Sequence, residues 1–168
     1  KFRSTVLVNE IVRFRGRLDL MIMFISGKKL RFLNKKVLTI LRIGFYEIIF
    51  DHKVPDYAAV DSSVNLAHKF TNKKTIGFTN AVLRNLVRTK DKDHNWYEEL
   101  KCKVGWSSVP VWMEKRWLVN FGQKKLDKLI EFINQPSETF IRCDIDSNSM
   151  QKNIRLLEED GIKTELYL

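Results

Sequence analysis

The sequence is poor in cysteine, glycine and proline and has no long apolar run. Its two cysteines are too few for a disulfide framework or a zinc cluster, and they indicate a reducing compartment such as the cytoplasm. The longest apolar run, Leu20–Ile25, has six residues, whereas a membrane span needs roughly 20. Only 7 glycines and 3 prolines occur in 168 residues, which argues against a disordered chain. We therefore expect an ordered cytoplasmic protein with no membrane partner.

The sequence also lacks the motifs of a self-contained enzyme. No two glycines lie closer than eleven residues apart, so there is no glycine-rich loop to hold a phosphate or nucleotide. His52, His68 and His94 do not have the spacing of metal ligands. Cys102 lies between two lysines but has no base partner in the pattern. We predict no catalytic residue, no cofactor-binding residue and no metal ligand in this chain.

Positive charge is in excess, and it is concentrated in the first half of the chain. The whole sequence has a net charge of +10. Residues 1–90 hold 18 basic and 6 acidic side chains, whereas residues 91–168 hold 12 and 14. This asymmetry is typical of a part that binds a polyanion followed by a neutral part. Nucleic acid is the leading candidate partner, because neutralising phosphates releases counterions; the alternative is a basic surface that only confers solubility.

The basic residues gather in three places. An arginine triplet comes first, a lysine-rich stretch follows Gly27, and two arginines four residues apart share one face of a predicted helix. Guanidinium groups match phosphate oxygens and stack on bases. We predict that RNA is contacted by Arg13, Arg15, Arg17, Lys28, Lys29, Arg31, Lys35, Lys36, Arg84 and Arg88. For Arg84 the alternative is an ion pair with a carboxylate inside the protein.

Apolar residues recur at helical spacing through the first ninety residues, which predicts an all-helical bundle with short loops. The predicted helices cover residues 4–25, 30–50, 56–70 and 75–89. Gly16 is expected to break or bend the first helix, and Gly27 to end it. A glycine inside a helix costs about 1 kcal/mol relative to alanine, so Gly44 predicts that another helix packs closely against the second one.

The same periodicity makes predictions about single residues. Val8 and Val12 lie on the apolar stripe of the first helix and are expected to face the core. Ala81 is expected to face inward from the fourth helix. Asp56 follows Val54 and Pro55 and is expected to be the N-cap of the third helix.

The second half of the chain has a different organisation. A polar linker precedes helical stretches over residues 96–104, 109–121 and 124–133. This connecting region contains Trp96, Trp106, Trp112 and Trp117. Alternating residues then predict strands over 139–145 and 162–168, with a helix over 150–160 between them. Ser147, Asn148 and Ser149 are expected to cap that helix, and Gly161 to end it. The fold class is mainly α: a helical bundle (1–92), connecting helices (93–136) and a partial β-α-β unit (137–168).

Several segments resemble a known family. Leu41–Phe50 and Gly77–Arg88 resemble the NusB-like helical domain, in the form that opens the bacterial Sun/Fmu-type (RsmB-like) ribosomal RNA cytosine-5 methyltransferases. Val109–Gly122 resembles the segment that leads into the methyltransferase module of that family. Asn134–Ile162 resembles the opening of its RRM-like RNA-binding subdomain.

The resemblance implies a division of labour. In such enzymes a C-terminal Rossmann-like domain binds S-adenosylmethionine and carries two cysteines, one after a proline and one after a threonine. Cys102 follows Lys101 and Cys143 follows Arg142, so neither cysteine matches and the catalytic domain is expected to be absent. The chain would be an inactive fragment, also lacking the first helices of the bundle, that recognises small-subunit ribosomal RNA for an S-adenosylmethionine-dependent enzyme.

Two other functions stay open at this point. The first is a NusB-type transcription antitermination module, which binds RNA together with a ribosomal protein. The second is a protein-interaction domain whose basic face only aids solubility. The residues after position 105 argue against the first, because a lone antitermination factor does not need them.

Overall fold

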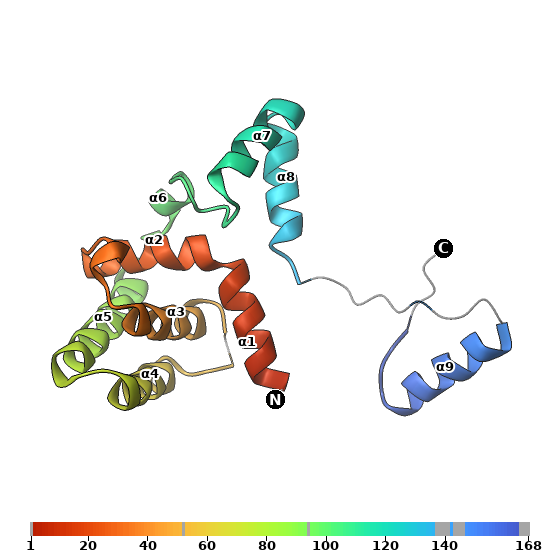
Figure 1. Ribbon diagram of the computed structural model, residues 1–168, viewed down its shortest axis with the longest axis horizontal. Coiled ribbons are helices and arrows are strands. Elements are labelled where there is room, and N and C mark those ends of the chain that lie inside the picture. The colour runs from red at the N-terminus through yellow and green to blue at the C-terminus, as the bar shows by residue number, and fades with distance from the viewer. Residues whose placement is uncertain (1, 52, 94, 137–141, 143–146, 165–168) are drawn as a thin grey trace. The chain divides into compact units, whose positions relative to one another are not determined.

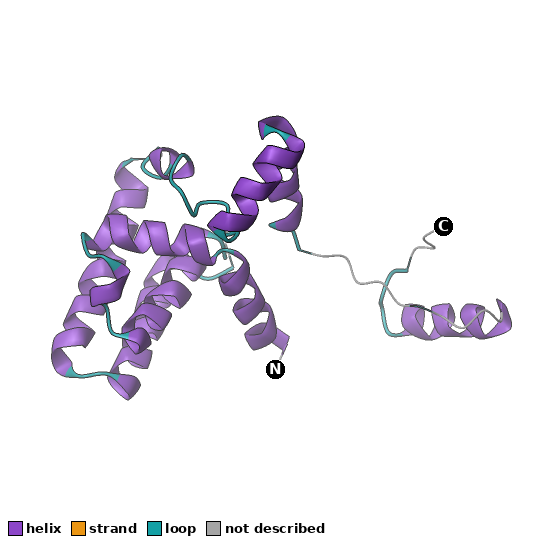
Figure 2. Ribbon diagram, turned by 45° about the horizontal axis from the view of Figure 1, so that its top comes forward, coloured by secondary structure: helices purple, strands orange, loops and turns teal. Residues whose placement is uncertain are grey.

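The computed structural model describes residues 2–51, 53–93, 95–136, 142 and 147–164, and all its regular elements there are helices (Figure 2). They divide into two units, Lys1–Gln135 and Pro136–Leu168. In the first unit (Figure 1) the elements are α1 (Phe2–Arg13), α2 (Arg15–Ser26), the 3₁₀ turn η1 (Leu30–Phe32), α3 (Lys35–Ile49), α4 (Asp56–Phe70), α5 (Lys73–Lys92), α6 (Glu98–Lys101), α7 (Val111–Phe121) and α8 (Gln123–Ile133). The second unit contains α9 (Ser147–Glu159).

Helix α3 is the centre of the bundle and packs against α1, α2, α4 and α5. Its apolar stripe places Leu41 and Phe45 out of contact with solvent. Leu18 and Met21 of α2 and Leu83 of α5 are equally buried and join the same core. The all-helical bundle predicted for the first ninety residues is therefore confirmed.

Gly44 lets the three central helices approach one another. A Cβ atom added at Gly44 would lie 2.7 Å from Ser63 Oγ of α4 and 2.8 Å from Leu83 Cδ2 of α5. These distances are shorter than real Cβ atoms tolerate, so both neighbours occupy the space that a side chain would need. The prediction that another helix packs closely at Gly44 is confirmed, and two helices, α4 and α5, do so.

The first predicted helix is two helices, and the interruption lies at Phe14, two residues before the predicted glycine. Ser108, far along the chain, caps α2: its Oγ accepts hydrogen bonds from Gly16 N (3.0 Å) and Arg17 N (3.3 Å). A Cβ atom on Gly16 would lie 2.0 Å from the carbonyl oxygen of Gly105. Gly16 is therefore required for the close approach of this loop. Gly27 ends α2 as predicted, with φ 65° and its N–H donating to Met23 O.

Three other helix boundaries differ from the sequence pattern. Helix α3 begins at Lys35, not at residue 30, because the Asn34 side chain accepts a hydrogen bond from Lys36 N (2.8 Å) and caps it there. Asp56 is the first residue of α4, whose N-cap is Pro55, so its predicted capping role is wrong. Its carboxylate instead accepts hydrogen bonds from Lys90 Nζ at 2.9 and 3.0 Å. The helix predicted over 96–104 is reduced to α6.

The inward orientation predicted for three side chains is wrong. Val8 is 59% exposed and Val12 is 65% exposed, because α1 packs against the bundle through its other face, which carries Ile11. Ala81 is exposed, because the buried face of α5 is formed by Val82, Leu83 and Leu86. In both helices, therefore, the apolar stripe is wider than the face that packs against the bundle, and its outer residues remain exposed.

In the second unit, α9 begins at Ser147, three residues before the predicted start, so the serines expected as caps belong to the helix. Its predicted end is confirmed: Gly161 has φ 77° and donates to Glu158 O (2.9 Å), and Ile162 N donates to Leu157 O (2.8 Å), which is a Schellman motif. Apart from Arg142, the strand predicted over 139–145 lies outside the described residues. Of the strand predicted over 162–168, residues 162–164 have no regular structure and the remainder lies outside the described residues.

Gly44 and Gly77 provide a matched pair of helix glycines. Gly44→Ala is expected to destabilise the protein by about 1–3 kcal/mol, because overpacking a tight core outweighs the gain in helix propensity. Gly77→Ala is expected to stabilise it by about 0.5–1 kcal/mol, because a Cβ there meets nothing within 4 Å. Urea unfolding of both variants measures the difference, and equal effects would contradict the packing at Gly44.

Glu47 of α3 is 8% exposed, and burial raises the pKa of its carboxyl group above the usual 4.5, opposed by Arg3 and reinforced by Asp51. A raised folded-state pKa means that the fold favours the protonated acid, so stability falls as the pH rises from 4.5 through the folded-state value. Glu47→Gln is expected to be more stable than the parent at pH 7, and the difference should shrink below pH 4.5. Thermal unfolding across this range measures it, with the exposed Glu99→Gln as the control.

Candidate nucleic-acid interface

The connection between α2 and α3 is a short, strongly basic segment. Residues 28–36, called the basic segment here, contain five cations and no carboxylate: Lys28, Lys29, Arg31, Lys35 and Lys36. All five are exposed. In the part of the chain that the structure describes, none of them forms an ion pair. This segment therefore presents uncompensated positive charge to solvent.

The start of α3 adds to this positive charge. Lys35 and Lys36 occupy its first turn, where there is no acidic residue. A helix N-terminus carries a partial positive charge and unpaired N–H groups, so lysines there are unfavourable for the isolated helix. The same arrangement is favourable for a bound anion such as a phosphate group.

Aromatic rings accompany the cations of the basic segment. Lys28 Nζ lies 4.6 Å from the ring centre of Phe78 on α5, and the Arg31 guanidinium lies 4.8 Å from that of Phe32. The Phe32 side chain is 69% exposed. Asn85 Nδ2 of α5 donates to the carbonyl oxygen of Ile25 (3.2 Å), which holds α5 beside the end of α2. The basic segment and α5 thus form one surface.

The arginine triplet has a different environment. Arg13 pairs with Glu10, and Arg17 Nε donates to Trp106 O at 3.2 Å. The Arg17 guanidinium also lies over the rings of Phe14 (5.1 Å) and Trp106 (5.5 Å), and burial lowers its pKa. Arg15 is exposed, 3.9 Å from a carboxylate oxygen of Asp19. The structure therefore engages Arg13 and Arg17 in protein contacts and leaves Arg15 facing solvent.

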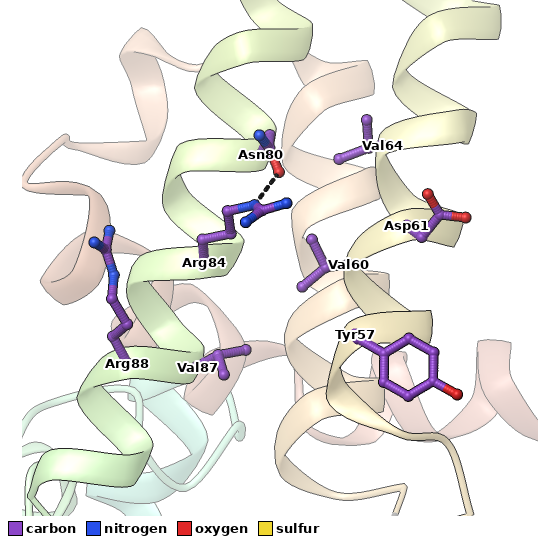
Figure 3. Close-up of a pocket in the computed structure, with 8 residues that line it drawn as sticks. All are labelled: Tyr57, Val60, Asp61, Val64, Asn80, Arg84, Val87 and Arg88. Atoms are coloured by element: carbon purple, nitrogen blue, oxygen red, sulfur yellow. Dashed lines mark hydrogen bonds between the residues drawn. The ribbon is translucent and has the colours of Figure 1, made fainter.

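Arg84 and Arg88 line a groove of about 740 Å³ between α4 and α5 (Figure 3). The ion pair considered for Arg84 is not formed among the described residues: its Nε donates to Asn80 Oδ1 at 3.0 Å. Figure 3 shows Arg84 extending toward α4 and Arg88 extending along α5, away from α4. The other lining residues are Tyr57, Val60, Asp61, Val64 and Val87.

Other chemistry is sparse in the part of the chain that the structure describes. No three His, Cys, Asp or Glu side chains there come together to hold a metal ion. Cys102 and His68 are both exposed. None of the helices in the described ranges is long and apolar enough to cross a membrane.

The structure thus brings the basic segment next to α5. It does not bring the arginine triplet together: Arg13 contacts Glu10 of α1, Arg17 contacts Trp106, and Arg15 faces solvent.

Sequence reasoning missed two aromatic members of these surfaces, Phe32 and Tyr57. Phe78 was expected to face inward, and it does pack against the core while its ring contacts Lys28. The adjacency of Phe32 to Arg31 was a usable signal, because an aromatic residue inside a charged stretch has no apolar stripe to join. The sequence around Tyr57 gave no comparable signal, because the residues that face it across the groove belong to α5 and are distant in the sequence.

Comparison with known proteins finds two kinds of relative. The profile of the NusB family matches residues 3–88. The transcription antitermination protein NusB of Lacticaseibacillus casei (strain BL23) is 31% identical over 86 residues, covering 50% of this chain and 64% of the relative. That of Clostridium novyi (strain NT) is 42% identical over 60 residues, covering 36% and 45%.

The second kind extends much further along the chain. The ribosomal RNA small subunit methyltransferase B of Pasteurella multocida (strain Pm70) is 27% identical over 158 residues. That alignment covers 92% of this chain but only 33% of the relative. The chain therefore spans about a third of that methyltransferase and less than two thirds of the NusB relatives.

Arg17 is expected to act as a structural residue. Arg17→Met should destabilise the protein by about 1–3 kcal/mol, because it removes a hydrogen bond from a charged donor and two ring contacts. Arg15→Met, two residues away, should change stability by less than about 1 kcal/mol, since its ion pair is exposed. Urea unfolding compares the two variants, and equal stability would contradict the role of Arg17.

Proposed function

We propose that this chain, which belongs to the NusB family, binds small-subunit ribosomal RNA and presents it to the methyltransferase domain of a longer protein. The observation that carries the RNA binding is the basic segment, with five exposed cations in nine residues. Phosphate neutralisation by such groups supplies essentially all of non-specific nucleic-acid binding and a large share of specific binding.

The distribution of ion pairs supports this role over mere solubility. Some cations elsewhere in the bundle are compensated: Arg42 forms two hydrogen bonds with Asp19 at 2.7 and 2.8 Å, and Lys90 binds Asp56. Other exposed cations, such as Lys69 of α4, are single, whereas the basic segment gathers five within nine residues. The basic segment has no acidic residue in its sequence, and two of its lysines occupy an unfavourable helix position. A surface that only promoted solubility would not need cations gathered at the positive end of a helix.

The length of chain that each alignment covers supports the proposal that this chain is part of a longer methyltransferase. The NusB profile ends at residue 88, whereas an alignment of 158 residues with methyltransferase B must include α6, α7 and α8. Helices α7 and α8 expose large apolar side chains, including Trp112, Val119 and Phe132. An adjoining domain would remove such surface from water.

The chemistry of the parent protein is part of the same proposal. By resemblance, it transfers a methyl group from S-adenosylmethionine to carbon 5 of a cytosine in the cytoplasm, and residues 137–168 begin an RRM-like subdomain. The residues of this chain do not fit S-adenosylmethionine, because no glycine-rich loop occurs in the sequence. The role assigned to this chain is therefore RNA recognition alone.

An antitermination module is the alternative, and the NusB relatives at 31% and 42% identity favour it over the first ninety residues. The two functions are distinguished by the reading frame beyond Leu168. A downstream glycine-rich motif with Pro-Cys and Thr-Cys pairs supports the methyltransferase. A stop codon shortly after Leu168 supports the antitermination module.

RNA binding through the basic segment is expected to depend strongly on salt. The triple variant Lys29→Met, Lys35→Met, Lys36→Met should weaken binding to a small-subunit ribosomal RNA fragment. The slope of the logarithm of the binding constant against the logarithm of the salt concentration should become shallower by about 0.7–0.9 for each phosphate that the variant no longer neutralises. Fluorescence anisotropy at several salt concentrations measures both quantities.

The matched control removes three exposed lysines from α8, as Lys124→Met, Lys125→Met, Lys128→Met. It changes the net charge by the same amount and leaves the basic segment intact. Equally weakened binding in the two triple variants would show that net charge, not the basic segment, determines binding, and the proposal would fail.

A further inference from the structure

We propose that the groove between α4 and α5 holds an unpaired nucleotide of the bound RNA, with its base against the helices and its phosphate at Arg84. The proposal rests on the RNA binding proposed above and specifies which form of RNA is recognised. The groove is distinct from the basic segment, because its lining residues come from α4 and from the following turns of α5.

The shape of the groove suits a flat, partly apolar group. Its volume of about 740 Å³ lies within the range of small-ligand sites. Val60 and Val64 extend from α4 toward α5 and, with Val87, provide an apolar floor (Figure 3). Tyr57 stands on the α4 rim with 79% of its side chain exposed. An exposed aromatic ring beside an apolar floor is the arrangement on which unstacked bases pack.

The polar residues suit a nucleotide better than an acidic peptide. Arg84 is exposed, and Asn80 orients its guanidinium by accepting a hydrogen bond from Nε. The remaining N–H groups of Arg84 stay available for phosphate oxygens. Asp61, on the opposite rim, repels any anion beside it, which leaves the Arg84 side for the phosphate. Its carboxylate already accepts a hydrogen bond from Asn65 Nδ2 (3.1 Å) and can accept another from the exocyclic amine of a base. The groove therefore favours cytosine or another amino-bearing base over uracil.

The exposed face of α5 connects this groove with the basic segment. Gly77, Ala81, Arg84 and Arg88 recur at helical spacing along one exposed stripe. A Cβ at Gly77 would meet nothing within 4 Å, so the bundle itself does not require a small residue there. Two small residues followed by two arginines allow an RNA backbone to pass close to the helix and then reach the groove. Double-stranded RNA cannot place a base in it, because its bases are paired and stacked.

The test uses fluorescence anisotropy with three labelled probes: an eight-nucleotide oligo(C), an oligo(U) of equal length, and a duplex RNA. Tyr57→Ala should weaken oligo(C) binding by about 5- to 150-fold, the range for removal of one stacked base, and leave duplex binding and the salt slope unchanged. Tyr57→Phe should retain the parent affinity. Asp61→Ala should abolish the preference for oligo(C) over oligo(U).

Arg84→Met should lower the salt slope on oligo(C) by about 0.7, as expected for one phosphate contact on a single strand. The exposed Arg116→Met on α7 is its charge-matched control and should leave the slope unchanged. Thermal unfolding of each variant checks that the bundle is intact.

The outcomes separate this proposal from the one on which it rests. If Tyr57→Ala binds oligo(C) like the parent, or weakens duplex binding equally, the groove proposal is overturned while binding through the basic segment stands. If an oligoglutamate peptide binds the parent and Tyr57→Ala abolishes that binding alone, the groove is a peptide site and the proposal is overturned. If the unsubstituted chain binds no RNA probe, both proposals fail.

Discussion

The close approach of α3 to α4 and α5 at Gly44 is the contact on which the arrangement of the bundle depends. Because Ser63 Oγ and Leu83 Cδ2 occupy the space of a missing Cβ, both helices lie unusually near the central one. That position fixes the separation of α4 from α5, and hence the width of the groove between them. A single absent side chain in the core therefore influences the groove that α4 and α5 line together.

Electrostatics divides the many cations of this chain into two groups. Cations that stabilise the bundle have partners: Arg42 binds Asp19, Lys90 binds Asp56, and Arg17 is held by a carbonyl oxygen and two rings. Cations that face solvent are densest in the basic segment and recur along α5, and others lie elsewhere, such as Lys69 of α4 and Lys124 of α8. Only the second group retains its hydrogen-bond donors for a polyanion, so the number of basic residues overstates the size of the RNA-binding surface.

The loop that precedes α7 connects the bundle with the helices beyond the family profile. Ser108 caps α2, and Trp106 accepts a hydrogen bond from Arg17. On the other side, Asn134 at the end of α8 donates to Ser107 O (3.1 Å), and Ser107 donates to Glu114 of α7. The residues that distinguish this chain from a lone NusB-type domain are thus integrated with it through polar contacts, not merely attached by a linker.

Much of this protein follows from local sequence alone. Apolar periodicity determined the helices of the first ninety residues, and single glycines marked the end of α2 and of α9, because left-handed backbone is cheap only for glycine. Charge patterning indicated a polyanion-binding half, and the basic segment needed no structure to be noticed. Tertiary structure alone decided where α1 ends, which face of α1 is buried, and which arginines are free. Each of these depends on a partner distant in the sequence, such as Ser108 for Gly16 or Trp106 for Arg17, and a local pattern contains no information about contacts of that kind.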